Sequence, residues 1–160
     1  METYNARQFA ELAITSEFLQ DNHSRSVRGT LRGLHYQLRH PQAKLCRVVV
    51  GEVLDVAVDI RHGSPTFGKS FSVHLSAENK RQIYIPRGFA HGFVVLSDMA
   101  EFLYKCDDFY RGDDDRGIAW NDPELGIDWL VLDPLLSDKD RRNPRLADVD
   151  PSELPVYSID

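Results

Sequence analysis

The chain is poor in cysteine, and it lacks both a long apolar run and an excess of basic residues. Its two cysteines, Cys46 and Cys106, are too few for a disulfide framework or a cysteine-based zinc site, and both lie within apolar runs. We therefore expect both to be packing residues in a cytoplasmic protein. No apolar stretch approaches the roughly 20 residues that a bilayer-spanning helix needs, and the start lacks the apolar segment of a signal peptide. No membrane interaction is predicted.

The charge balance argues against nucleic acid as a partner. The formal net charge is -6, so no general basic field would attract a polyanion. Basic residues such as Arg32 and Lys44 remain candidates for binding a small anionic ligand. With 160 residues, of which 42% are hydrophobic and 28% charged, the chain is long enough for one domain with a substantial core.

Before the last third of the chain, helical periodicity is confined to the start, where it predicts one helix over 3–13 with Thr3 or Asn5 as the N-cap. Short runs rich in Val, Ile, Phe and Tyr then alternate with Gly, Pro, Asn and Asp. They predict strands at 17–21, 30–37, 44–50, 53–61, 69–76, 81–86, 92–97, 100–106 and 116–120. We interpret Gly51-Glu52 as a hairpin turn. This spacing predicts a sandwich or barrel and nearly excludes a doubly wound fold.

Strand periodicity also assigns side chains to faces. In the run 53–60, Leu54, Val56, Val58 and Ile60 share one face, and Asp55, Ala57 and Asp59 share the other. The aspartate face lines a polar cavity if it points inward and meets solvent if it points outward, and period alone does not choose. We expect His74 to lie on the surface, and the acidic run 113–115 to be a solvated loop tip.

The run 31–37 sets His35 between an arginine, a glycine and a tyrosine. An imidazole has an unperturbed pKa near ~6.5, so His35 could transfer protons, or it could be a hydrogen-bonded histidine at the core edge. A metal site is a rival, but Gln37 stands where a His-x-His pair would have its second ligand, and only His91 could supply another. Metal-free acid–base chemistry is therefore favoured. It would need a His base, a carboxylate, a cation for an enolate and a Tyr donor.

Motifs spread over nearly the whole chain resemble those of dTDP-4-dehydrorhamnose 3,5-epimerases. The runs that carry the resemblance are 18–24, 32–37, 51–60, 64–68, 75–82, 85–93, 100–105, 120–123 and 137–140. The resemblance implies an all-β, cupin-type jelly roll that works as a homodimer without a metal or a diffusible cofactor. It also implies a thymidine-diphosphate-linked 4-keto-6-deoxy sugar as substrate.

The same resemblance implies roles for individual residues. His35 would be the base that removes a proton next to the C4 ketone, and Asp140 would be its carboxylate partner. Tyr110 would donate a proton on the opposite face, and Lys44 would lie near the ketone oxygen. The residues implied to line the substrate or its nucleotide are Arg32, Gln20, Asn22, His91 and Glu2. A single-carbon epimerase and a non-catalytic sugar-nucleotide-binding protein are the alternatives.

Three departures qualify the resemblance. Strict alternation puts Arg32 and His35 on opposite faces, so both reach one cavity only if Gly33 marks a bulge or Arg32 reaches around a rim. Arg111-Gly112 and Asp115 replace a Pro and a Glu of the family, which could loosen the loop that holds Tyr110. The chain also begins inside a family motif, after the usual first strand, and we hypothesise that Met1 is an internal methionine. We expect one domain over 1–160, with a helical segment at 1–16, a barrel at 17–130 and a C-terminal arm at 131–160.

Overall fold

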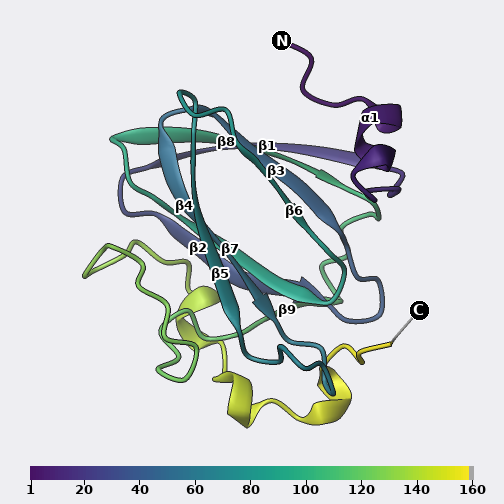
Figure 1. Cartoon of the computed structure of the whole chain (residues 1–160). Helices are drawn as coiled ribbons and strands as arrows, with labels where there is room; N and C mark the ends of the chain where they lie inside the picture. Colours follow the sequence, from purple (N-terminus) through teal and green to yellow (C-terminus); the bar gives the residue numbers. More distant parts are fainter. Residues whose placement is uncertain (159–160) are drawn as a thin grey trace.

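Nine strands among the described residues, 1–158, form two antiparallel sheets that face each other in the computed structural model (Figure 1). One sheet has the order β1-β8-β3-β6 and the other β5-β4-β7-β2-β9. The strands are β1 Gln20–Val27, β2 Leu31–Gln37, β3 Lys44–Val50, β4 Glu52–Asp59, β5 Ser70–Ser76, β6 Gln82–Ile85, β7 Phe89–Val95, β8 Met99–Cys106 and β9 Asp115–Gly117. The all-β prediction is confirmed.

Two apolar cores hold these layers. Between the sheets, Cys46 and Phe102 from one sheet pack against Val53 and Phe93 from the other. The outer face of the five-stranded sheet packs against the segment that follows β9, which contributes Trp129 among other residues. That segment includes three short 3-10 helices, η1 Asp140–Arg142, η2 Leu146–Asp148 and η3 Pro151–Glu153. The strands β4 and β7 of the five-stranded sheet are therefore buried on both faces, whereas the edge strand β5 is mostly exposed.

Strand β4 resolves the question that its period left open. Leu54, Val56 and Val58 belong to the outer core beneath the C-terminal segment, whereas Val53 and Ala57 belong to the core between the sheets. Asp55 lies between Val53 and Ala57 on the same face and is completely buried. The aspartate-bearing face therefore points into the molecule.

The prediction for the first strand was wrong. A strand was expected at 17–21, but β1 begins at Gln20 and pairs with β8 over eight residues. Its inward side chains include Asn22 and Ser26, which are polar because this strand lines cavities as well as the core. The apolar residues Phe18 and Leu19 drew the prediction to the wrong end.

The prediction of a hairpin turn at Gly51-Glu52 was also wrong. Strand β3 pairs with β6 and β8, while β4 pairs with β5 and β7, so Gly51 carries the chain from one sheet to the other. Its φ of +73° and the closeness of the Met99 carbonyl, 2.0 Å from where a Cβ would lie, both require glycine.

The N-terminal helix is shorter than predicted. α1 spans Ala6–Glu11, and the Asn5 side chain caps it by accepting from the Arg7 N–H. The segment around it lies against the four-stranded sheet, with Thr3 and Ser16 bonded to Gln82 and Tyr84. Figure 1 shows α1 beside one end of the sandwich, away from the C-terminal segment. Of the helices in residues 1–158, none is both long and apolar enough to cross a membrane.

The acidic run 113–115 is not simply a solvated loop tip. Asp113 is exposed, but Asp114 is fully buried and accepts the backbone N–H groups of Arg39 and His40 at 2.9 and 2.8 Å. Burial alone would raise the pKa of Asp114, yet these bonds hold it below its ordinary value. His74, by contrast, is exposed as expected.

Candidate active site

A bulge in β2 brings Arg32 and His35 to the same face. Arg32 pairs with Phe93 and His35 pairs with His91, so three steps on β2 match two on β7. At Gly33 the φ is +137°, and a Cβ there would lie 2.5 Å from the Cα of Gly92. Phe93 belongs to the core between the sheets, so its partner Arg32 points inward, as does His35. Of the two alternatives that the sequence left open, a bulge at Gly33 or an Arg32 that reaches around a rim, the structure shows the bulge.

His35 is paired with a carboxylate from the C-terminal segment. Its Nε2 lies 2.5 Å from Oδ1 of Asp140, which follows it by 105 residues and is only 3% exposed. Burial alone would raise the pKa of Asp140, but hydrogen bonds from His35, Ser137 and the Gly33 backbone hold it below its ordinary value. Asp140 is therefore a fixed anion against which the imidazole is oriented.

The other side of His35 opens into a cavity of about 100 Å³ between the two sheets. Five of the residues implied by the resemblance line this cavity: His35, Lys44, Tyr110, Gln20 and Asn22. Tyr36, Gln37, Gln42, Tyr104, Cys106 and Asp115 complete the lining. We call this space the inner pocket.

Arg32 lies at a second cavity, of about 450 Å³, which we call the arm pocket because the C-terminal segment forms one wall. His35 and Asp140 line it as well, and His35 is the residue that borders both pockets. The guanidinium of Arg32 donates to the Ser26 hydroxyl on β1 at 3.0 Å. Arg32 is thus held near His35 without lining the inner pocket.

Tyr104 is a pocket residue that the sequence reasoning missed. It lies on β8, in the sheet opposite His35, and the Lys44 ammonium sits 5.9 Å from the centre of its ring. Burial, followed by the nearby Cys106 and Cys46, raises the pKa of Tyr104 to about 12. Within residues 1–158 its hydroxyl makes no hydrogen bond to another residue. Alternation along the predicted strand 100–106 already put Tyr104 on the face of Phe102.

Tyr110 is held differently. It is 58% exposed, its backbone N–H donates to Gln20, and its hydroxyl donates to Asp115 at 3.0 Å. Desolvation and the Asp115 carboxylate raise the pKa of Tyr110. Lys139 forms an ion pair with the same carboxylate. Although this loop departs from the family pattern, Tyr110 is thus held by Gln20 and by Asp115.

His91 is closed inside the molecule. Its Nε2 bonds both oxygens of Asp55, at 2.9 and 3.1 Å, and its ring lies 6.1 Å from that of Phe102. Burial lowers the pKa of His91 below 6.5, an effect that Asp55 opposes and that Lys44 and His35 reinforce. At 7% exposure His91 does not line the inner pocket. The resemblance implied a substrate-lining residue here.

Cys46, Asp55 and His91 are the described residues that could together hold a metal, since their ligand atoms lie within 4.8 Å of one another. However, His91 and Asp55 already hydrogen-bond to each other. The positive charge of Lys44 also lies close enough to affect the pKa of both Cys46 and His91. Burial raises the pKa of Cys46 well above its usual value, which disfavours the thiolate that a metal would need. Both cysteines are free and buried, as packing residues should be.

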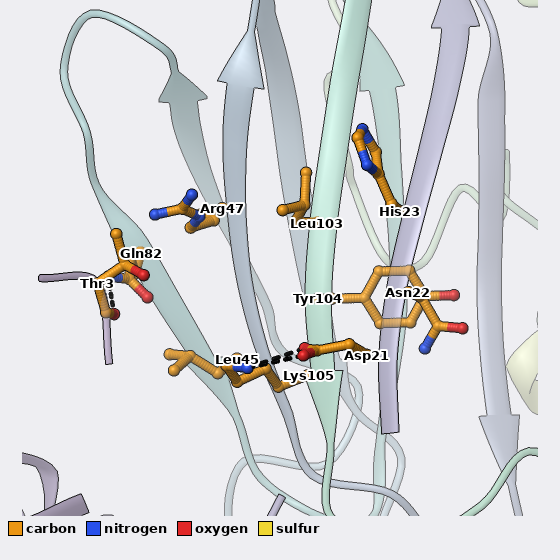
Figure 2. Close-up of a pocket in the computed structure, with 10 residues that line it drawn as sticks. All are labelled: Thr3, Asp21, Asn22, His23, Leu45, Arg47, Gln82, Leu103, Tyr104 and Lys105. Atoms are coloured by element: carbon orange, nitrogen blue, oxygen red, sulfur yellow. Dashed lines mark hydrogen bonds and ion pairs between the residues drawn. The ribbon is translucent and has the colours of Figure 1, made fainter. Parts of the chain in front are cut away.

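Glu2 is not brought to either pocket. It is exposed, and its carboxylate accepts from the Asn5 side chain at 3.3 Å. The neighbouring Thr3 borders a different hollow of about 230 Å³, on the face of the four-stranded sheet that points away from the core (Figure 2). Figure 2 shows the Asp21–Lys105 ion pair and the Gln82–Thr3 bond in that hollow.

A family model described as dTDP-4-dehydrorhamnose 3,5-epimerase matches residues 1–148. The chain belongs to this epimerase family. The Pseudomonas aeruginosa dTDP-4-dehydrorhamnose 3,5-epimerase is 62% identical over 151 residues, which are 93% of this chain and 83% of that protein. Members of the family are epimerases, so the protein is an enzyme of the isomerase class. The resemblance seen in the motifs is thereby confirmed.

Solved structures of epimerases share the fold. A dTDP-6-deoxy-D-glucose-3,5-epimerase from Legionella pneumophila, in complex with dTDP-4-keto-L-rhamnose, superposes with a TM-score of 0.96 at 52% identity, covering 99% of this chain and 85% of that one. A 3'-monoepimerase from Streptomyces bikiniensis, with one His replaced by Asn and one Tyr by Phe, has a TM-score of 0.90 at 36% identity, over 98% of this chain and 80% of that one. The protein is thus a cupin-type epimerase.

Proposed function

We propose that the protein inverts C3 and C5 of dTDP-4-dehydro-6-deoxy-D-glucose to give dTDP-4-dehydro-L-rhamnose, without a metal or a diffusible cofactor. The observation that carries this proposal is the His35–Asp140 pair, 2.5 Å apart at the boundary of two pockets. The names of the relatives support the reaction, and the ligand of the Legionella structure supports the substrate class.

In the proposed mechanism His35 is the base. Hydrogens at C3 and C5 are acidic because the electron pair left behind moves onto the C4 carbonyl oxygen and forms an enolate. Asp140 fixes the imidazole and stabilises the imidazolium that forms when His35 takes the proton. Lys44 lines the same pocket and supplies the positive charge that stabilises the enolate oxygen.

Inversion needs a proton from the face opposite His35, and a tyrosine is proposed to supply it. Tyr110 is the donor that the resemblance implies, but its hydroxyl is engaged by Asp115. Tyr104 is the second candidate, since it lies in the opposite sheet beside Lys44. Tyr104 follows His35 by 69 positions, whereas Tyr110 follows His35 by 75 positions. In the Streptomyces variant the replaced His and Tyr are 70 positions apart. We therefore favour Tyr104 as donor and Tyr110 as a wall of the pocket.

The remaining roles concern binding and assembly. We propose that Gln20 and Asn22 contact the sugar, and that Arg32, at the arm pocket, attracts the diphosphate. A homodimer is proposed, in which Glu2 and the exposed N-terminal segment would contact the nucleotide in the partner subunit. A cytoplasmic location is proposed because both cysteines are free thiols.

The deciding experiment is incubation with the 4-keto sugar nucleotide in deuterated water, with the label located by NMR. Deuterium at both C3 and C5, with inversion at both, is the expected result. Label and inversion at one carbon alone would favour the second candidate function, a monoepimerase like the Streptomyces neighbour. No label at either carbon would overturn an epimerase function of either kind.

The donor is tested in the same assay. Tyr104→Phe should still exchange deuterium, because His35 can remove and return a proton on one face, but it should lose inversion. Tyr110→Phe should keep inversion at a reduced rate. The reverse result would make Tyr110 the donor.

A further inference from the structure

We propose that Gln37 is a positioning residue that holds the segment 109–111 in place, so that Tyr110 forms a wall of the inner pocket. This inference rests on the proposed function, because it concerns the pocket in which the epimerisation would occur. Gln37 stands where a metal-binding barrel would have a second histidine. In the structure its side-chain amide instead hydrogen-bonds to backbone groups.

The contacts of Gln37 all go to backbone groups. Its Oε1 accepts the Arg111 N–H at 2.7 Å, and its Nε2 donates to the carbonyl oxygens of His40 and Phe109 at 2.6 and 3.3 Å. The side chain is only 5% exposed. A buried amide with these three partners fixes both ends of the segment against β2, two residues beyond His35.

Hydrogen bonds, rather than regular secondary structure or apolar burial, hold this segment in place. Residues 109–111 belong to no helix or strand, so their backbone groups have no ladder partners. The Phe109 and Tyr110 side chains are 54% and 58% exposed, so apolar burial holds neither of them firmly. Gln20, from the other sheet, accepts the Tyr110 N–H at 2.9 Å. Two glutamine side chains therefore make three of the hydrogen bonds to the backbone of this segment, and the others among the described residues are those of the Phe109 N–H to Asp108 and of the Asp114 N–H to the Arg111 carbonyl.

The clamp is connected to the Tyr110 hydroxyl through β9. Gln37 pairs with Asp115 across β2 and β9, and Asp115 accepts the hydrogen bond of the Tyr110 hydroxyl. The backbone beside Tyr110 is thus bonded to β2, the strand that carries His35, and the Tyr110 hydroxyl is bonded to a residue that pairs with β2. A shift of about 1 Å in such a wall can cost roughly 100-fold in rate, because reacting groups must be closely aligned.

The test combines amide exchange with kinetics in the full-length protein. Gln37→Met removes all three bonds at similar side-chain length. We expect faster hydrogen exchange at the amides of Tyr110 and Arg111, and a fall of about 10- to 100-fold in kcat/KM for the 4-keto sugar nucleotide. In a Tyr110→Ala background the same change should cost less than about 2-fold, because coupled residues are not additive.

Asn79 offers a matched control. It is also an amide that clamps a loop, accepting the N–H groups of Ser76 and Arg81 and donating to the His74 carbonyl at 3.0 Å. It lines neither pocket. Asn79→Leu should leave kcat/KM unchanged. If Gln37→Met does not fold, Gln37→Glu replaces it, since a carboxylate still accepts the Arg111 N–H but loses both donations of Nε2, and it should give a smaller loss that is also coupled to Tyr110.

Three outcomes would overturn the inference: unchanged amide exchange in Gln37→Met, faster exchange with unchanged kcat/KM, or an equal kinetic loss with and without Tyr110. Failure of the wild-type enzyme to turn over the sugar nucleotide would instead overturn the proposed function. The exchange measurement would then still decide whether Gln37 holds the segment.

Discussion

His35 and His91 face each other across β2 and β7, and each bonds a carboxylate through Nε2. The surroundings differ. The His35 side chain is 31% exposed and borders two pockets, whereas His91 is 7% exposed and pairs with the fully buried Asp55 of the adjacent strand. The comparison teaches that a His–Asp pair does not by itself specify a base. What separates the two pairs is access, because His35 borders both pockets and His91 borders neither.

The largest effect should come from replacing the two histidines in turn. His35→Asn should lower kcat/KM by about 1,000-fold, because it removes the proposed base. His91→Asn should lower it by about 10-fold at most, because His91 is buried and lines neither pocket. Turnover of the 4-keto sugar nucleotide, normalised to folded protein, measures both. Equal losses would show that the two pairs do not differ in role.

Asp140→Asn should have the next largest effect. The amide fills the same space but carries no charge to stabilise an imidazolium, so kcat/KM should fall by roughly 100-fold. Asp138→Asn is the matched control, since Asp138 is an exposed neighbour in the same segment that lines neither pocket. A similar loss in both variants would point to the segment as a whole, and would contradict a specific role for the Asp140 carboxylate.

The two pairs also differ in how far the sequence could predict them. The run 31–37 carries a strand pattern and a glycine that suggested a bulge, so the position of His35 could be anticipated. The apolar runs likewise placed most strands within a few residues. Asp140 could not be found in this way, because it sits in the charged run Lys139–Arg142 and reaches His35 only when the C-terminal segment folds back. The family resemblance alone pointed to it.

The failures share a physical cause. Strand β1 was misplaced because its inward residues are polar, and Asp114 was taken for a solvated residue although it caps the backbone at Arg39. Gly51 looked like a hairpin turn, although it joins two different sheets. In each case a polar or flexible residue takes part in a contact between segments that are distant in the sequence. Hydrophobic periodicity reports only which residues avoid water, so it does not detect such contacts.

Removing the carboxylate of each pair should affect stability differently. Asp55→Ala leaves Nε2 of His91 buried without a partner, which should lower the free energy of unfolding by about 2 kcal/mol. In Asp140→Ala the half-buried His35 can bond to water, so a loss of about 1 kcal/mol is expected. Urea denaturation at neutral pH measures both. A smaller loss of stability for Asp55→Ala than for Asp140→Ala would contradict the assignment of His91–Asp55 as the pair that is shielded from water.

The smallest effect concerns pH. Burial lowers the pKa of His91 below 6.5, so between that folded-state value and 6.5 the unfolded chain binds a proton that the native protein does not. Stability should therefore be fully present above pH 6.5 and should fall as the pH drops below it, by at most about 1.4 kcal/mol per pH unit for one proton. His91→Gln should flatten this slope, whereas replacing the exposed His74 by Gln should leave it in place. Denaturation curves between pH 7 and 5 measure the difference, and a slope that survives in His91→Gln would assign it to other groups.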